Sequence, residues 1–354
     1  MRRFICAALA ALYLTIPALA VETLPEESFS LSCTAAVLME RQTGTVLYEK
    51  EAHRHLSPAS VTKVMTLLLV AEAVESGAVS PDDPVTASRR AASMGGSQIW
   101  LEEGEELSVA ELIKCVAVVS ANDCAVALAE RIAGSEAAFV ERMNERAAEL
   151  GLENTRFTNC TGLFDDTGHY SCALDIARMS CELLGHEWIR EYTTIWMDSI
   201  RDGAFELTNT NKLVRNYEGC TGLKTGYTST AMYCLAASAE REGTEYVAVI
   251  MHAESVESRN RDAAALLDYG FAGFTLYQPQ LPQDRLHPVA VKQGMQTQVE
   301  PQVEALPQAV VRKNEVDGIE IKLELSEQLQ APVAKGQAIG WIQLVQNGSI
   351  IAQQ

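Results

Sequence analysis

The sequence predicts an α+β domain followed by a small all-β domain. Residues 31–49 and 223–251 alternate apolar and polar side chains as β-strands do, whereas residues 87–185 have a mostly helical pattern. Beyond them, residues 319–325 and 339–345 alternate again in short stretches. The first domain should therefore consist of an antiparallel sheet flanked by helices, with an all-helical insertion between its sheet-forming ends.

Residues 1–20 are typical of a secretory signal peptide. Arg2 and Arg3 precede an apolar run that ends at Pro17, and small residues 18–20 form a cleavage site. The run is too short to span a bilayer. We expect the mature chain to begin at Val21 and to act outside the cytoplasm, secreted or at most peripherally bound to a membrane.

The net charge and the cysteine pattern argue against a nucleic-acid-binding protein and against a metal site. The net charge of −19 becomes −21 when two arginines leave with the signal peptide, which argues against a nucleic-acid partner. Eight of the nine cysteines remain, and Cys160 and Cys172 are the best candidates for a disulfide in an exported chain. No Cys-x-x-Cys or histidine cluster suggests a metal, and no cofactor is expected.

A β-hairpin over residues 31–49 is followed by a helix over residues 60–75. Ser57 is the expected N-cap of this helix and Pro58 its first residue, where a missing N–H does no harm. The helix is apolar on nearly every side, so it should run through the core. Ser60 would then lie in the first turn, where backbone N–H groups lack helical partners.

Four helices are predicted in the middle of the chain. Ser108 and Glu111 form a capping box for a helix that ends at Val119. Asp123 begins the next helix, which Gly134 ends. The last two cover residues 135–150 and 173–184.

Strands and one more helix complete the first domain. Residues 223–227, 233–239 and 246–251 have strand composition, and Glu242-Gly243 is a hairpin turn between the last two. A helix over 259–269 should stop at Gly270. A linker with Pro279 and Pro282 then divides residues 21–277 from the β domain, residues 278–354, for which a spacer or packing role is favoured over a binding role.

Three short motifs indicate acyl-transfer chemistry. Ser60 and Lys63 are three residues apart, which places their side chains on one helix face about 5 to 6 Å apart at Cβ. A buried lysine near a second cation loses its proton easily, and can then act as a base. The second motif, Ser120-Ala121-Asn122, lies at the end of a predicted helix. The third motif, Lys224-Thr225-Gly226, lies in a predicted strand, and Lys224 is the second cation near Lys63.

Each motif alone could arise by chance, and Ser258-Arg259-Asn260 is one such coincidence. Their order and structural context carry the signal. The chain resembles the low-molecular-mass penicillin-binding proteins, which are serine-type D-alanyl-D-alanine carboxypeptidases related to the serine β-lactamases. The resemblance covers about residues 32–274 and includes residues 58–66, 95–97, 120–123, 168–171, 209–211 and 222–228. The C-terminal β domain also matches the family's layout.

The resemblance implies a role for each motif residue. Ser60 is the nucleophile, Lys63 its base, and Ser120 the relay that protonates the leaving D-alanine. Asn122 holds the substrate backbone, and Lys224 keeps the local potential positive.

The strand motif would bind the substrate. Thr225 hydrogen-bonds the terminal carboxylate, and the oxyanion hole combines the N–H groups of Ser60 and Tyr227. Gly226 permits close approach, and an extended stem peptide of peptidoglycan pairs beside this strand. Such enzymes remove the terminal D-alanine from stem pentapeptides and are acylated by β-lactams.

Three departures from the family pattern affect substrate binding and anchoring. Thr221 replaces an aspartate found in many relatives, and His252 follows Met251 where some have a carboxylate-binding arginine. Arg259 is a candidate substitute. The chain ends at Gln354 without the amphipathic helix of many relatives.

Other functions remain open from the sequence. A class A β-lactamase needs a deacylating Glu-x-x-Leu-Asn run, which this sequence does not contain, so penicillin should act as an inhibitor. A D,D-endopeptidase would use the same residues. A non-catalytic peptidoglycan-binding protein would not need Ser60, Lys63, Ser120 and Lys224. A histidine-based hydrolase is disfavoured because there is no Gly-x-Ser-x-Gly.

Overall fold

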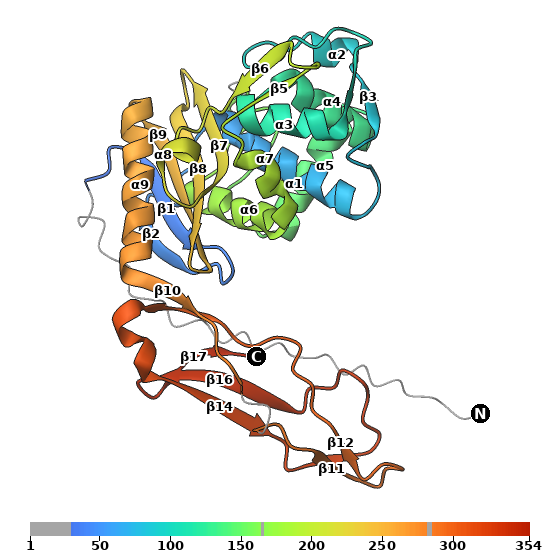
Figure 1. Ribbon diagram of the computed structural model, residues 1–354, viewed down its shortest axis with the longest axis vertical. Helices are drawn as coiled ribbons and strands as arrows, with labels where there is room; N and C mark the ends of the chain where they lie inside the picture. The colour runs from blue at the N-terminus through green and yellow to red at the C-terminus, as the bar shows by residue number, and fades with distance from the viewer. Residues whose placement is uncertain (1–29, 164–165, 282–284) are drawn as a thin grey trace. The chain divides into compact units, whose positions relative to one another are not determined.

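The computed structural model describes residues 30–163, 166–281 and 285–354 (Figure 1). The expected signal peptide, residues 1–20, and the expected start at Val21 lie outside these residues. The described chain forms two compact units. One comprises the residues up to Tyr277 together with Val310–Val316, and the other comprises Gln278–Ala309 and Asp317–Gln354.

A five-stranded antiparallel sheet is the centre of the first unit. Its strand order is β2-β1-β9-β8-β7. The strands are β1 (Ala35–Glu40), β2 (Val46–Lys50), β7 (Cys220–Thr228), β8 (Met232–Arg241) and β9 (Thr244–Ala253). The predicted strands and both hairpins are confirmed. Glu242 and Gly243 both have positive φ, 52° and 75°, as a tight two-residue hairpin turn requires.

Helices cover both faces of this sheet. Strand β1 shows why, because Val37 and Met39 belong to one apolar cluster while Ala36 and Leu38 belong to the other. Helix α9 (Val256–Gly273) covers one face, and the remaining long helices lie on the other (Figure 1). Both faces are therefore buried, and the sheet is held rigidly.

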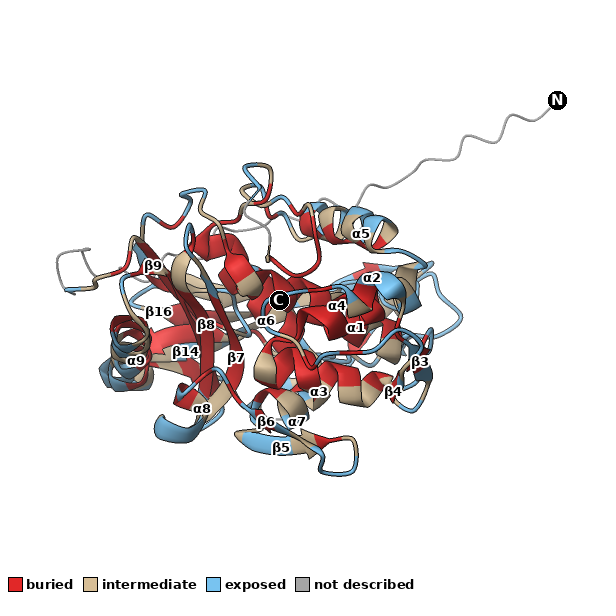
Figure 2. Cartoon of the chain, turned by 90° about the horizontal axis from the view of Figure 1, so that it is seen from above, coloured by how far each residue is buried: buried red, intermediate tan, exposed pale blue. Residues whose placement is uncertain are grey.

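The helical insertion agrees with the predicted pattern. Its longer helices are α1 (Lys63–Glu75), α3 (Val109–Val119), α4 (Asn122–Ala133), α5 (Glu136–Glu149) and α6 (Ala173–Gly185), and its one-turn helices are α2 (Arg89–Ala92), α7 (Arg190–Thr193) and α8 (Leu213–Asn216). The capping box at Ser108 is present. Helices α1, α3 and α4 are buried along most of their length (Figure 2).

Two predicted helix ends were wrong. The segment before α1 is a 3₁₀ turn, η2 (Ala59–Thr62), capped at Pro58 rather than Ser57, so α1 itself begins at Lys63. Helix α9 continues through Gly270, because this glycine serves packing rather than termination. A Cβ there would lie 3.0 Å from the Tyr246 ring.

Two small antiparallel strand pairs lie within the insertion and were not predicted. Strands β3 (Pro84–Thr86) and β4 (Glu106–Ser108) form one, and β5 (Met197–Ile200) and β6 (Phe205–Thr208) form the other. Their strands are three or four residues long, too short for a periodic signal. A short 3₁₀ turn, η3 (Glu187–Ile189), precedes α7.

The C-terminal residues form short strands. Strands β14 (Ile319–Leu325), β16 (Gly340–Gln346) and β17 (Ser349–Gln353) make one sheet, and β11 (Val289–Lys292), β12 (Gln298–Val299) and β15 (Gln328–Gln330) make another. Both strands predicted here are confirmed. Strand β13 (Ala309–Arg312), followed by turn η5 (Lys313–Gly318), pairs with β10 (Phe274–Tyr277).

Cys160 and Cys172, the best candidates for a disulfide, are not bonded to each other. All eight cysteines among the described residues are free thiols. The Cys160 thiol lies 3.6 Å from a Glu136 carboxylate oxygen, whereas the Cys172 sulfur accepts a hydrogen bond from the Asp175 N–H at the start of α6. The two sulfurs therefore have different partners, which their spacing in the sequence could not reveal.

Candidate active site

Ser60 lies in the tight turn η2, in contact with two glycines. Ala59, which precedes it, has φ of 46°, an uncommon conformation for a residue with a side chain. A Cβ on Gly226 would lie 3.1 Å from the Ser60 nitrogen, and a Cβ on Gly162 would collide with the Ala59 carbonyl. Strand β7 and the loop around residue 162 thus both press against the turn that presents Ser60.

Lys63 is fully buried and reaches three oxygen atoms. Its Nζ lies 3.0 Å from Ser60 Oγ, 2.6 Å from Asn122 Oδ1 and 2.8 Å from the Thr161 carbonyl oxygen. Burial lowers the pKa of Lys63 to about 7, and nearby Cys160 and Asp123 oppose that shift. Burial is therefore the main cause of a base that is half deprotonated near neutral pH.

Ser120 and Asn122 lie in the junction between α3 and α4. Ser120 ends α3 in the left-handed conformation, with φ of 64°. Its Oγ is buried and has no hydrogen-bond partner among the described residues. Asn122 donates from Nδ2 to the Gly95 carbonyl at 2.7 Å while its Oδ1 accepts from Lys63. The amide predicted to hold substrate thus also links Lys63 to the loop at Gly95.

Strand β7 carries the other predicted residues along the edge of the sheet. Lys224 is buried, and burial together with repulsion from Lys63 and Arg259 holds its pKa well below the usual range. The Thr225 hydroxyl lies 2.7 Å from that of Thr210. Tyr227 is exposed, and its ring is tilted against that of Tyr233 with ring centroids 4.5 Å apart.

The loop at residues 158–162 completes the surroundings of Lys63, and motif reasoning missed it. Asn159 Oδ1 accepts hydrogen bonds from the backbone N–H groups of Thr161 and Gly162 and so shapes the loop. His169 accepts from the Thr158 N–H at Nδ1, and its Nε2 lies 2.7 Å from Thr62 Oγ1. A backbone carbonyl such as that of Thr161 leaves no residue-type signal in the sequence.

Buried charged residues lie at two of the departures from the family pattern. Thr221 Oγ1 lies 2.7 Å from a carboxylate oxygen of the buried Glu245, whose other oxygen pairs with Arg41 and Arg190. Glu245, from β9, thereby places a carboxylate beside position 221. Burial lowers the pKa of Arg259 to about 10, and its charge acts on Lys224.

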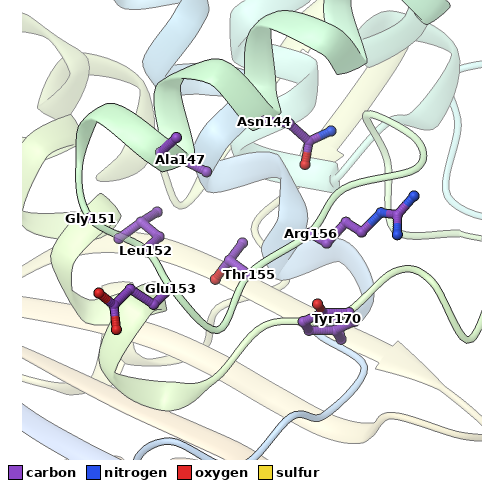
Figure 3. A pocket seen from close by; sticks show the side chains of 9 residues that line it. Asn144, Ala147, Gly151, Leu152, Glu153, Thr155, Arg156 and Tyr170 are labelled. Atoms are coloured by element: carbon purple, nitrogen blue, oxygen red, sulfur yellow. The ribbon is translucent and has the colours of Figure 1, made fainter.

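A separate groove of about 690 Å³ lies elsewhere on the unit (Figure 3). Its walls come from the end of α5 and the segment after it, and include Asn144, Arg156 and Tyr170. Ser60, Lys63 and the other predicted site residues do not line it. The cluster around Ser60 is the candidate site because of its chemistry rather than its volume.

The described residues contain neither a cluster of metal ligands nor a membrane-spanning helix. No group of three or more histidine, cysteine or acidic residues could hold a metal ion there. Within the same residues, no helix has both the length and the apolar character needed to cross a membrane.

Comparison with known proteins identifies the family. A family model described as D-alanyl-D-alanine carboxypeptidase matches residues 21–255. This chain belongs to that family. A second model, described as the C-terminal domain of penicillin-binding protein 5, matches residues 279–354. The family resemblance, the α+β fold and the all-β C-terminal domain expected from the sequence are confirmed.

Individual family members are similar over most of the chain. D-alanyl-D-alanine carboxypeptidase DacF of Bacillus subtilis is 42% identical over 90% of this chain and 83% of its own. Penicillin-binding protein 5 from Haemophilus influenzae superposes with a TM-score of 0.81, at 30% identity, over 94% of this chain and 96% of its own. Penicillin-binding protein D2 from Listeria monocytogenes was solved with ampicillin bound. It superposes with a TM-score of 0.63, at 32% identity, over 69% of this chain and 99% of its own.

Proposed function

We propose that this protein is a serine D-alanyl-D-alanine carboxypeptidase that removes the terminal D-alanine from peptidoglycan stem pentapeptides. One observation carries the proposal: Lys63 Nζ lies 3.0 Å from Ser60 Oγ while its burial lowers its pKa to about 7. A nucleophile within hydrogen-bond distance of a base that is neutral near pH 7 is the arrangement that acyl transfer needs.

The first half of the reaction forms the acyl-enzyme. Ser60 Oγ attacks the carbonyl carbon of the last peptide bond as its proton passes to Lys63 Nζ. The oxyanion that forms is stabilised by the N–H groups of Ser60 and Tyr227. Ser120 then donates its hydroxyl proton to the departing amine nitrogen, the C–N bond breaks, and Lys63 reprotonates Ser120. The unpartnered Ser120 hydroxyl supports this role, because no existing hydrogen bond has to break.

The second half releases the shortened peptide. Water attacks the ester carbon and gives a proton to Lys63, and the bond to Ser60 Oγ breaks as that oxygen regains a proton. Lys63 therefore ends the cycle in its starting state. Because a dedicated deacylating glutamate run is missing from the sequence, we expect the penicillin ester to persist.

Substrate recognition is assigned to the open edge of β7. This strand pairs only with β8 within its sheet, so an extended peptide can add beside it and pair with its backbone. Thr225 and Lys224 would bind the terminal carboxylate, and Asn122 the peptide backbone. Gly226 supports this placement because its missing side chain leaves room between β7 and the turn at Ser60.

The family relationship and the sequence support a place outside the cytoplasm. We infer that the protein acts on the cell wall after export, either secreted or peripherally membrane-associated. β-Lactams should acylate it, and the Listeria relative was solved with the β-lactam ampicillin bound. Nucleic acid is not among the expected partners.

A labelled penicillin tests the nucleophile directly. We expect it to attach at Ser60, and Ser60→Ala to abolish both labelling and D-alanine release because the variant lacks the hydroxyl that forms the ester. Ser180→Ala, which changes a buried serine of α6, is the matched control and should keep both. Labelling that persists in Ser60→Ala would exclude Ser60 as the nucleophile.

Substrate choice requires a second assay. Free D-alanine released from a stem pentapeptide indicates a carboxypeptidase. Cleavage products from cross-linked muropeptides, without release of D-alanine from the pentapeptide, would indicate an endopeptidase instead. A protein that is not labelled by penicillin and that forms neither D-alanine nor muropeptide cleavage products would be a non-catalytic peptidoglycan-binding protein.

A further inference from the structure

Trp100 is held in an exposed and strained position beside the candidate site. Its side chain is 64% exposed, whereas its neighbours Ile99 and Leu101 are buried. Its φ is 56°, in the left-handed region that a bulky side chain seldom adopts. Such strain persists only where the surrounding structure enforces it, and it concentrates at functional positions.

Asp123 enforces this conformation from the site itself. Its buried Oδ2 accepts hydrogen bonds from the N–H groups of both Ile99, at 3.0 Å, and Leu101, at 3.1 Å. Asp123 directly follows Asn122, whose N–H donates to the Ser97 carbonyl at 2.7 Å. The residue that contacts Lys63 and the residue that turns Trp100 outward are therefore adjacent.

A second segment supports the indole from the side. The Phe205 ring, in β6, meets it edge-on with centroids 5.8 Å apart. Arg201 donates to the Ile99 carbonyl at 2.9 Å and pairs with Glu105, which fixes the loop that carries Trp100. A large apolar side chain held rigidly in solvent loses little conformational entropy on binding, which is what a recognition residue needs.

We propose that Trp100 binds a pyranose ring of the peptidoglycan glycan strand that carries the stem peptide. The apolar C–H face of a sugar ring can lie on an exposed indole while its hydroxyl groups remain in water. Exposed Glu102 and Glu103 lie close by in the chain and favour a neutral ligand over an acidic one. This inference rests on the proposed function, because it assigns a second part of the same substrate.

The distances are compatible with one substrate that reaches both places. Trp100 lies three positions after Ser97, a span of at most about 11 Å, and the Ser97 carbonyl accepts a hydrogen bond from the Asn122 N–H. A four-residue stretch of extended stem peptide covers up to about 14 Å. A sugar at the far end of the peptide can therefore reach the neighbourhood of Trp100 while the scissile bond lies at Ser60.

The test compares two substrates with the full-length protein. D-Alanine release is measured from a free stem pentapeptide and from the same pentapeptide attached to its disaccharide. For Trp100→Ala we expect kcat/KM to fall about three- to tenfold on the disaccharide substrate, mainly through KM, which is the loss of one aromatic contact. Activity on the free peptide should stay within about twofold of wild type.

Two controls separate stacking from structure. Trp100→Phe keeps an aromatic face and should recover most of the loss. Trp341→Ala removes the other strongly exposed tryptophan among the described residues, at 49% exposure, and should match wild type on both substrates. Equal losses on both substrates for Trp100→Ala, or no loss on either, would overturn the proposal.

A binding measurement keeps this inference separate from the proposed function. Calorimetry with uncharged N-acetylglucosamine oligosaccharides compares Ser60→Ala with the double variant Ser60→Ala/Trp100→Ala, so no catalysis is needed. We expect binding that weakens about three- to tenfold in the double variant. Equal affinities would refute glycan stacking even if D-alanine release proceeds as proposed. Failure of wild type to release D-alanine from either substrate would refute the proposed function alone.

Discussion

At the scale of single residues, Ser120 combines burial with a hydroxyl that has no partner. Ser120→Ala removes no hydrogen bond within the described structure, so the free energy of unfolding should change by less than about 1 kcal/mol. If Ser120 carries the proton to the leaving group, D-alanine release should fall at least about 100-fold. Urea unfolding and a D-alanine assay measure the two effects.

Ser180 supplies the comparison for that substitution. Its Oγ is likewise buried without a partner, but it lies in α6 and outside the candidate site. Ser180→Ala should leave stability and activity close to wild type. A comparable loss of activity in both variants would mean that Ser120 acts through packing rather than through proton transfer.

The lowered pKa of Lys63 predicts how acylation depends on pH. Lys63 accepts a proton only in its neutral form, and that form disappears as pH falls below its pKa of about 7. The penicillin acylation rate should therefore fall about tenfold per unit below pH 7 and level off above about pH 8. Stopped-flow labelling from pH 5 to 9 measures this, with circular dichroism to verify folding. A flat profile would contradict Lys63 as the base.

At the scale of elements, the candidate site depends on segments that fit closely around the η2 turn. Gly162 has φ of 70°, and a Cβ there would collide with the Ala59 carbonyl and lie 2.7 Å from Thr62 Oγ1. Gly162→Ala should displace the loop whose Thr161 carbonyl binds Lys63. We expect slower penicillin acylation and a loss of at least about 2 to 4 kcal/mol in the free energy of unfolding.

Gly134 is the matched control for Gly162. It has a similar φ of 80° at the end of α4, but a Cβ there would meet nothing within 4 Å. Gly134→Ala should cost only the backbone strain, about 1 to 2 kcal/mol, and leave acylation unchanged. If both substitutions lower the free energy of unfolding by the same amount, the structure can accommodate a Cβ at position 162 next to the Ala59 carbonyl.

Sequence patterns predicted the elements well where the signal was local. The alternation in β7, β8 and β9 and the capping box at Ser108 were sufficient, because each depends on neighbouring residues. The start of α1 was wrong because contacts from Gly162 and Gly226, distant in sequence, hold residues 59–62 in a tighter turn. Gly270 was misinterpreted for a similar reason, since the Tyr246 ring that it packs against belongs to another element.

The candidate site was predictable to a similar extent. Ser60, Lys63 and Asn122 do meet, at the distances that hydrogen bonds require. The Thr161 carbonyl could not be predicted, because every residue has a carbonyl and only the folded loop selects this one. The ion pairs of Glu245 with Arg41 and Arg190 could not be predicted from the sequence either, because the three residues come from separate parts of the chain.

At the scale of the whole molecule, all proposed catalytic groups belong to the first unit. A chain ending at Tyr277 should therefore retain penicillin labelling at Ser60. It also loses β13, whose Val310 is buried in the apolar cluster on the α9 side of the sheet, so its melting temperature should fall by several degrees. Full-length Val310→Ser measures the contribution of this contact alone. Loss of labelling in the folded, shortened chain would show that the C-terminal residues support the site.

The three oxygen atoms around Lys63 make its position suitable for both of its protonation states. As an ammonium, Lys63 donates one hydrogen bond to each oxygen. As a neutral amine, it can keep donating to Asn122 and Thr161 while its one lone pair faces the Ser60 hydroxyl. The proton can then travel back and forth in every catalytic cycle while no heavy atom of the lysine has to change place.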